Sequence, residues 1–304
     1  LGFNQGLTWS TTVVTKIDLA GPAHRGLAVG LNEAAGHAAV AVTSLFAGHL
    51  AETHGLRPAP FLLGLAYAVL ALGIALGVRE TRDHADLEAA ETNRPDPDAP
   101  IPMWTNSDIF LDTSIREPAL SAASQAGWST TSTSHCLGAC SPLLFATAEL
   151  SLTQIGVLVA LYPGVWGVGQ LITGEASDRY GRKPFITSGM AIQAVGLVVI
   201  ALGVSRIELQ HIVLGAGTAL VYPTLLTVVG DVARPAQRGR TVGVYRVRRD
   251  LGYAAGALLG GMVADLMGLH AAVWVAAVIS AVSALVVAVR LYETHPRVHA
   301  VISA

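Results

Sequence analysis

Charged side chains within apolar stretches are the residues of this chain best suited to chemistry. Glu33 and His37 are four residues apart, and so are Arg246 and Asp250, so each pair would share one face of a helix. In one interpretation Glu33, tuned by burial and by His37, exchanges a coupling proton. Arg246 or Asp250 would then pair with Glu33 or with a substrate. In the other interpretation, all four form structural ion pairs that close one end of a helical bundle.

A second group of polar or aromatic side chains could line a cavity between helices: Asn32, Trp9, Tyr222 and Gln170. Each alone is more often a packing residue than a ligand contact. His135, Cys136 and Cys140 could suggest a metal, but three ligands in an irregular stretch lack a fourth. We therefore predict no metal and no cofactor. The apolar segments show no nucleophile constellation, which argues against an enzyme.

The composition requires that most of the surface be shielded from water. Hydrophobic residues make up 52% of the chain and charged residues 13%, against roughly 25% charged in an average soluble domain. These values indicate a membrane protein that crosses the bilayer several times, and the long apolar segments described next make the predicted fold class an all-α membrane protein. A net charge of −2 argues against nucleic acid as a partner. The expected partners are the lipid bilayer, a small-molecule substrate and, as coupling ion, protons.

The helices that must position these residues follow from hydropathy, since a bilayer core needs roughly 20 apolar residues per helix. Suitable segments lie at 27–50, 58–78, 154–174, 184–204, 207–229, 241–267 and 269–290, with the tail of a further helix at 1–15. Residues 118–148 are long enough but are interrupted by a Ser/Thr-rich stretch at 128–141. Either two compensating frameshifts in the coding sequence produced that stretch, or its hydroxyls bond back to carbonyls of their own helix.

Lysine and arginine are unevenly distributed over the loops between these segments. Most fall on one side, and only Arg57 and Arg206 fall on the other. The positive-inside rule places the basic side in the cytoplasm. That side includes residues 80–117, an acidic and proline-rich linker, and the C-terminal tail at 295–304. We expect a monomeric, multi-pass protein of the bacterial cytoplasmic (inner) membrane.

A long block of sequence occurs twice, at the offset that aligns Asp18 with Asp231 and Arg25 with Arg238. Such repeats are typical of membrane transporters built from two like halves. Residues 1–79 would belong to the first half and residues 118–294 to the second, with further helices expected before residue 1. The same offset sets Glu33 opposite Arg246, His37 opposite Asp250, and Trp9 opposite Tyr222.

Between the segments at 154–174 and 184–204 the chain reads Gly174-Glu-Ala-Ser-Asp178-Arg179-Tyr-Gly181-Arg182-Lys183. The first glycine lets two helices approach, the second turns the chain, and the cations hold the loop at the cytoplasmic face. Asp178 could bond the N-terminus of a neighbouring helix or an arginine there. A plain positive tether is the alternative interpretation.

This segment resembles the signature loop that the major facilitator superfamily carries between its helices 8 and 9. The resemblance implies a bundle of twelve helices in two pseudo-symmetric halves. Nine of the twelve would be present here, from the end of helix 4 through helix 12. It also implies that the loop latches one state of an alternating-access cycle, with Asp178, Arg179 and Arg182 in that role.

A second glycine pattern lies in the segment at 241–267: Gly243, Gly252, Gly256, Gly260 and Gly261. It resembles the antiporter motif of the same family, with Ala257 in place of its proline. The family carries that motif on helix 5, however, and this segment corresponds to helix 11. Small residues at this spacing let membrane helices pack closely, so we favour packing, and antiport gains only a little support.

The sequence as a whole predicts secondary active transport of a small solute by alternating access. Proton coupling is expected, and efflux is slightly favoured over uptake. The alternative is a truncated membrane fragment or scaffold that does not transport.

Overall fold

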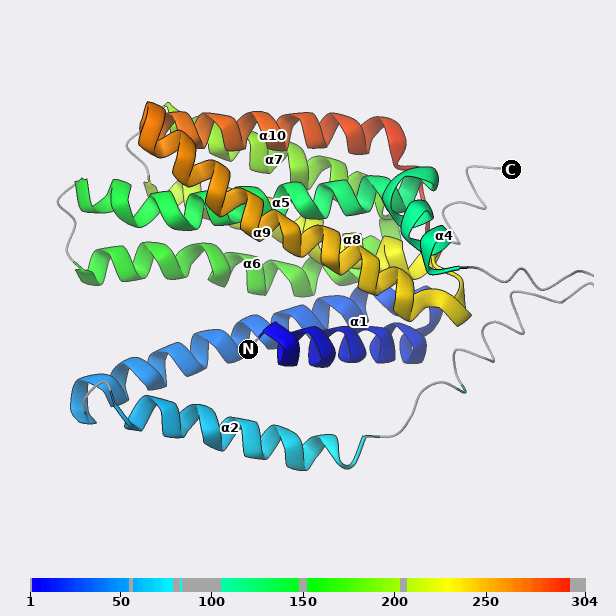
Figure 1. Ribbon diagram of the computed structural model, residues 1–304, viewed down its shortest axis with the longest axis horizontal. Coiled ribbons are helices and arrows are strands. Elements are labelled where there is room, and N and C mark those ends of the chain that lie inside the picture. Colours follow the sequence, from blue (N-terminus) through cyan, green and yellow to red (C-terminus); the bar gives the residue numbers. More distant parts are fainter. Residues whose placement is uncertain are drawn as a thin grey trace, which may run out of the picture.

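In the computed structural model, the chain is described at residues 2–54, 57–78, 83, 105–147, 152–202 and 207–295, and these residues are almost entirely helical, with no strand among them. The first helix, α1, runs Gly2–His54 and merges two helices across a kink at Gly21, where φ is 64°, followed by Pro22. Glycine adopts this left-handed conformation without a Cβ penalty. Helix α2 follows at Ala59–Ala75 (Figure 1).

The second half begins with two short elements and continues with six long helices (Figure 1). The short ones are α4, Asn106–Leu111, and a π-helical turn, Asp112–Arg116, at the end of the predicted linker. The long ones are α5 (Pro118–Thr147), α6 (Leu152–Tyr180), α7 (Lys183–Ala201), α8 (Ile207–Val232), α9 (Arg238–Met267) and α10 (Leu269–Arg290). With α1 counted as two helices, the described residues contain the nine predicted membrane helices, and the predicted fold class is confirmed.

Helix α5 is continuous through the Ser/Thr-rich stretch, so the expected interruption is absent. Its hydroxyls return to carbonyls one turn earlier: Thr131 donates to Gly127 at 3.0 Å, Thr133 to Ser129 at 3.0 Å. Ser134 donates to the Thr130 carbonyl at 2.7 Å. Some of the hydroxyls are therefore satisfied inside the helix, while Thr131 also donates to the Arg249 carbonyl of α9 at 2.6 Å. The structure is consistent with an authentic helix.

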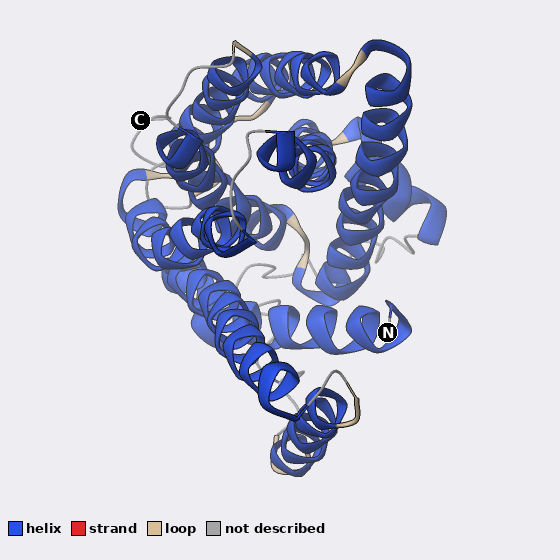
Figure 2. Cartoon of the chain, turned by 90° about the vertical axis from the view of Figure 1, so that its left-hand side faces the viewer, coloured by secondary structure: helices blue, strands red, loops and turns tan. Residues whose placement is uncertain are grey.

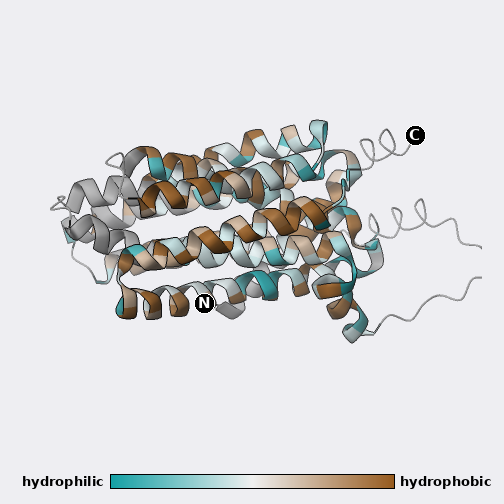
Figure 3. Ribbon diagram, turned by 90° about the horizontal axis from the view of Figure 1, so that it is seen from above, coloured by the Kyte–Doolittle hydropathy of each residue, from teal (hydrophilic) through white to brown (hydrophobic). Residues whose placement is uncertain are grey.

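Polarity divides the helices by their place in the bundle. By length and composition, three helices among the described residues suit a bilayer on their own, at Lys183–Ala201, Leu209–Val232 and Leu269–Arg290. Hydrophobic residues dominate the middle of the bundle, and hydrophilic ones are frequent at the end near the C-terminus (Figure 3). Large apolar side chains of α2, such as Phe61 and Leu72, are exposed, as expected of a helix that faces lipid.

The six long helices of the second half form a bundle, and α1 packs on its α6 and α8 side (Figures 1 and 2). Glycines permit the closest crossing, between α5 and α9. A Cβ at Gly252 or Gly256 would overlap carbonyl oxygens of α5, and one at Gly260 would lie 2.8 Å from the Cys136 Sγ. Gly243 and Gly261 have open space around the Cβ position. Three of the five predicted packing glycines therefore lie in a tight contact.

Candidate functional site

The signature segment lies largely within a helix, which corrects the expectation of a loop from residue 174 to 183. Helix α6 continues to Tyr180 and α7 begins at Lys183. Ion pairs at helical spacing extend α6 beyond its apolar part: Arg179 with Glu175 on the exposed face, and Arg182 with Asp178 on the buried face. Hydropathy alone placed the end of this helix too early because these charged residues continue it.

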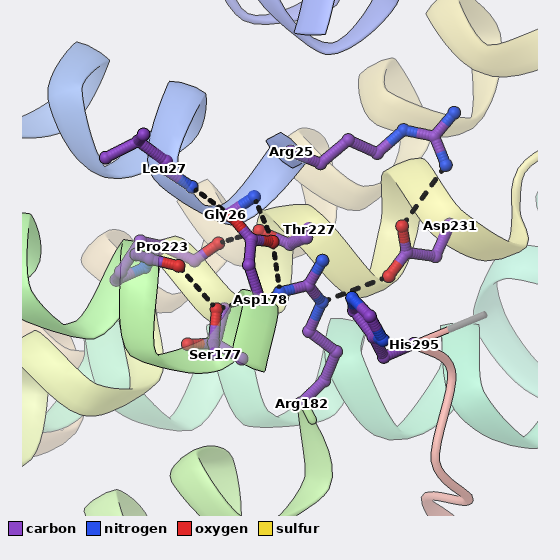
Figure 4. Close-up of polar contacts among 12 residues, drawn as sticks. Arg25, Gly26, Leu27, Ser177, Asp178, Arg182, Pro223, Thr227, Asp231 and His295 are labelled. Carbon is purple, nitrogen blue, oxygen red and sulfur yellow. Dashed lines mark hydrogen bonds and ion pairs between the residues drawn. The ribbon is translucent and has the colours of Figure 1, made fainter. Parts of the chain in front are cut away.

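Asp178 holds the start of the second part of α1. Its two carboxylate oxygens accept hydrogen bonds from the backbone amides of Gly26 at 2.9 Å and Leu27 at 2.8 Å (Figure 4). These amides follow the kink at Gly21 and would otherwise lack partners, and the positive end of the helix dipole favours a carboxylate there. A Cβ at Gly26 would lie 2.7 Å from both Asp178 Oδ1 and Ser177 Oγ. Glycine is therefore required at this crossing of α1 and α6.

Arg182 connects this contact to α8. Its side chain is fully buried and pairs with Asp178 at 2.7 Å and with Asp231 of α8 at 3.1 Å (Figure 4). Gly181, at φ 95°, turns the chain so that the backbone amides of Arg182 and Lys183 donate to Glu293 at 2.8 and 3.2 Å. Both the guanidinium and the backbone of Arg182 are thus fixed. The Arg179 side chain, 66% exposed, points away from this contact.

Two ion pairs join the two halves of the chain, and in each pair the acid comes from one half and the base from the other. Arg25 of α1 pairs with Asp231 of α8 at 3.2 Å, and Arg238 of α9 pairs with Asp18 of α1 at 2.5 Å. All four side chains are nearly buried. The repeat aligns Asp18 with Asp231 and Arg25 with Arg238, so each half supplies the acid of one pair and the base of the other. The repeat contained this signal, but sequence reasoning treated the arginines only as cytoplasmic tethers.

We call the end of the bundle where these pairs lie, with Asp178 and Arg182, the basic end. In Figure 1 it is the right-hand end, where the kink of α1 meets the start of α9. His295 also lies there, against Arg182 and Asp231 (Figure 4). Burial, and then the charge of Arg182, lower the pKa of His295. The neutral ring is therefore the form that suits this site.

A cavity of about 150 Å³ lies deeper in the bundle. Its lining comes from α5, α6, α8 and α9: Thr130, Thr131, Ser134, His135, Tyr162, Trp166, Tyr222 and Tyr253. A chain of hydrogen bonds braces one wall, from Gln193 to Thr218 at 2.9 Å, between Thr218 and Tyr162 at 3.1 Å, and between Tyr162 and Ser134 at 2.9 Å. Hydroxyls and aromatic rings thus share the lining.

Trp9 contacts both Glu33 and Arg246, the acid and the base that the repeat aligns with each other. Its indole Nε1 donates to Glu33 at 3.1 Å. The guanidinium carbons of Arg246 and Arg249 each lie 4.5 Å from the centroid of its ring, within reach of a cation–π attraction. Arg246 also pairs with Asp250 at 3.0 Å, as its spacing predicts. Glu33 is 6% exposed, so the indole supplies a hydrogen bond to a buried carboxylate.

His37 and Asn32 extend this arrangement in two directions. The Nδ1 of His37 lies 2.7 Å from the backbone oxygen of Glu33, and its ring contacts that of Trp166 at a tilt of 55°, with centroids 4.1 Å apart. Asn32 donates to Glu33 at 3.0 Å and accepts from Lys16 at 2.6 Å. His37 thus contacts the cavity wall. The hydrogen bond between His37 and Glu33 is made with the backbone oxygen of Glu33.

Sequence reasoning missed Arg249 and Trp166 as site residues. Arg249 lies between two residues that were predicted for the site, Trp9 and Tyr222. Its guanidinium carbon is 4.5 Å from the centroid of the Trp9 ring and 5.3 Å from that of the Tyr222 ring. Its position on the buried stripe of α9, four residues after Tyr245 and three before Gly252, was the available signal. Trp166 lies one turn from both Tyr162 and Gln170 on α6. Gln170 is fully buried, and its backbone oxygen lies 2.6 Å from a Cβ position at Gly30.

His135 and Cys136, two of the three residues that could have suggested a metal, have other neighbours in the structure. Cys136 donates to the Ala272 carbonyl at 3.6 Å, and the His135 ring contacts the Tyr253 ring at a tilt of 55°. The side chain of Cys140 lies outside the described residues. No group of three His, Cys, Asp or Glu side chains that could hold a metal occurs among those that the structure describes.

The fold and the site define a polytopic helical membrane protein with two pseudo-symmetric parts, closed at one end by buried ion pairs beneath a polar, aromatic cavity. A family model described as Major Facilitator Superfamily matches residues 1–135 and 119–304. The chain belongs to the major facilitator superfamily.

Solved structures support the same fold. The proton:xylose symporter XylE has a TM-score of 0.72 at 13% identity, over 95% of this chain and 70% of that one. The human organic anion transporter MFSD10 has a TM-score of 0.65 at 20% identity, over 91% of this chain and 67% of that one.

Curated relatives match over shorter stretches. The inner membrane transport protein YajR of Escherichia coli is 30% identical over 41% of this chain and 28% of its own length. Citrate exporter 1 of Aspergillus niger is 28% identical over 48% of this chain and 27% of its own length. The multidrug resistance protein MdtH of Aeromonas hydrophila is 33% identical over 31% of this chain and 24% of its own length. The matches thus span about a quarter of each of these relatives.

Proposed function

We propose that this chain moves a small solute across the membrane by secondary active transport, with the two halves rocking around the central cavity. The exchanged ion pairs, Arg25 with Asp231 and Arg238 with Asp18, carry this proposal. They join the two halves at one end of the bundle, below the cavity, and a rocking motion at that end must separate both. The positive-inside distribution makes the basic end cytoplasmic, so the structure corresponds to a state closed toward the cytoplasm.

The signature residues act as the latch of that closed state. Asp178 ties the start of the second part of α1 to the end of α6, and Arg182 ties Asp178 to Asp231. Gly174 belongs to the same crossing, where a Cβ would lie 3.2 Å from the Gly30 Cα. Helix ends held by side chains rather than by a continuous apolar core can separate without unfolding either half.

Glu33 is the group we propose for proton coupling. It is a buried carboxylate that accepts hydrogen bonds from Trp9 and Asn32. Through Trp9 it contacts the ring over which Arg246 and Arg249 lie. Its protonation would therefore change the charge balance next to both arginines. Among the relatives, XylE is titled a proton:xylose symporter, while others are named exporters or multidrug resistance proteins. These names slightly favour efflux, by antiport, from a bacterial cytoplasmic membrane.

Spin-label distances test the rocking motion. Labels at His24 and Arg240, both exposed at the basic end of the two halves, would be introduced into a chain in which Cys136 and Cys140 are replaced by serine. We expect two distance populations whose ratio changes between pH 5.5 and pH 8. In a His295→Gln background, which removes the histidine of the basic end, Glu33→Gln should abolish that change, and the matched control Glu175→Gln, an exposed carboxylate, should retain it.

The alternative function is a membrane fragment or scaffold that does not transport. A single distance population under all conditions, together with no gradient-driven solute flux in proteoliposomes, would favour it. A pH-dependent change that persists in Glu33→Gln would instead leave transport intact and remove Glu33 as the coupling site.

A further inference from the structure

The segment that follows α10 is folded against the basic end, although it forms no helix. We call residues 291–295 the C-terminal strap. Within it, the carboxylate of Glu293 accepts hydrogen bonds from the backbone amides of Arg182 and Lys183 at 2.8 and 3.2 Å. It also accepts one from the amide of His295 at 2.9 Å. Because the first amides of a helix have no partner within it, the strap satisfies donors at the start of α7.

The strap also contacts the ion pairs that join the two halves. The hydroxyl of Thr294 donates to Asp231 at 3.5 Å, and the His295 ring lies against Arg182 and Asp231 (Figure 4). Asp231 is the acid that pairs with Arg25 at 3.2 Å and with Arg182 at 3.1 Å. Release of the strap would therefore remove side-chain contacts from the centre of the latch.

The ring of His295 is enclosed at this contact without a hydrogen bond. The residue is 1% exposed, and neither ring nitrogen has a hydrogen-bond partner among the described residues. A neutral imidazole has one N–H donor, whereas a protonated one has two donors and a positive charge. A buried charge without hydrogen bonds costs far more free energy than a buried neutral group. The closed arrangement therefore suits the neutral ring.

Charged groups of both signs act on this ring from the elements packed around it. They are Arg182 between α6 and α7, Asp178 of α6, Asp231 of α8 and Glu293 of the strap itself. The three carboxylates already accept hydrogen bonds from backbone amides or arginines. Burial is the largest effect on the pKa of His295 and lowers it. The charge of Arg182 lowers this pKa further, and the carboxylates offset only part of both effects.

We propose that the C-terminal strap is a pH-sensitive lock on the basic end, released when His295 takes up a proton. A histidine in water takes up a proton near about pH 6.5, while the enclosed ring resists it. The strap is therefore held above about pH 6.5 and is released progressively as the pH falls below that value. This proposal goes beyond the proposed function, because the strap can leave without any movement of the two halves.

Hydrogen–deuterium exchange of the full 304-residue chain in nanodiscs tests the proposal. The amides of Arg182, Lys183 and His295 all donate to Glu293, so their exchange reports on the strap. If only the released strap takes up the proton, a fall from pH 7.5 to pH 5.5 favours release about ten-fold, because pH 5.5 lies about one unit below the pKa of a free histidine. After correction for intrinsic exchange rates, these amides should therefore exchange about ten-fold faster at pH 5.5.

Two variants and a matched control assign the effect to the named side chains. His295→Gln cannot take up a proton and should remove the pH dependence of exchange. His24→Gln changes an exposed histidine at the same end of the bundle and should retain the ten-fold increase. Glu293→Gln weakens the acceptor of all three amides and should speed their exchange at both pH values. Unchanged exchange in Glu293→Gln would show that this carboxylate does not hold the strap.

Equal exchange at the two pH values, or the same increase in His295→Gln as in the unaltered chain, would overturn the proposal. An increase confined to the range below about pH 5, where carboxylates titrate, would overturn it too. That pH profile of the unaltered chain decides the question if His295→Gln does not fold. These results are separable from transport. Two spin-label distance populations with a pH-independent strap refute only the lock, and a pH-dependent strap with a single distance population refutes only the rocking motion.

Discussion

Replacing Asp231 with asparagine is the most direct test of the ion pairs at the basic end. The Asp231 side chain is 1% exposed and lies 3.2 Å from Arg25 and 3.1 Å from Arg182. At an effective dielectric constant near 20, each attraction is roughly 5 kcal/mol before the cost of desolvation is subtracted. Removing one partner of a buried pair leaves the other charged and typically costs about 3–5 kcal/mol. We expect Asp231→Asn to destabilise the chain by that amount.

The assay is reversible unfolding of the detergent-solubilised chain, followed by tryptophan fluorescence. Glu175→Gln is the matched control, because Glu175 and Arg179 are 54% and 66% exposed and such pairs contribute about 1 kcal/mol or less. The double variant Arg25→Gln with Asp231→Asn should cost less than the sum of its single changes, by about 1–3 kcal/mol. Equal losses in Asp231→Asn and Glu175→Gln, or strict additivity in the double variant, would refute the reasoning.

Three further changes probe other parts of the structure. Gly26→Ala should destabilise by about 1–3 kcal/mol because its Cβ would meet Asp178, whereas Gly239→Ala, with open space at the equivalent position of the repeat, should stabilise by about 0.4–1 kcal/mol; unfolding curves compare them. Trp9→Phe should cost about 1 kcal/mol by removing the donor to Glu33, and an unchanged unfolding curve would contradict this. Because the pKa of His295 is lowered in the folded chain, the stability it supplies is complete above its unfolded pKa of about 6.5 and is lost as the pH falls below that value. Melting temperatures should therefore drop less between pH 7.5 and pH 5.5 in His295→Gln than in the unaltered chain, and equal drops would count against this account.

Helix positions were predictable because hydropathy reports directly on the need to keep water from the backbone. The ends of the helices were harder to predict. Helix α6 continues to Tyr180, where ion pairs rather than apolar residues stabilise it. In α5 the sequence left two explanations open, compensating frameshifts or hydroxyls that bond back to their own helix. The bond from Thr131 to the Gly127 carbonyl shows that this sequence can form a continuous helix, and the coding DNA remains the test of the frameshift.

The residues of the candidate site were easier to predict where the pattern that marks them lies within one short segment of the sequence. Asp178 and Arg182 stood out because their spacing is fixed within one short segment. Glu33 and Arg246 were paired through the repeat, but the indole of Trp9 that connects them could not be deduced from spacing. Arg249 was not predicted as a site residue. Its burial depends on how α9 is rotated against α5, and packing of Gly252 against the Trp128 carbonyl sets that rotation.

The exchanged partners at the basic end have a consequence for cooperativity. If Arg25 paired with Asp18, and Arg238 with Asp231, each half would satisfy its own charges and these four side chains would not hold the two halves together. Because the partners are exchanged instead, every path that opens this end must expose two acids and two bases at once. Two pairs related by one pseudo-axis lengthen together when the halves rotate about it. If the halves rock as we propose, opening is an all-or-none step, and loss of Asp18 alone should loosen the Arg25–Asp231 pair as well.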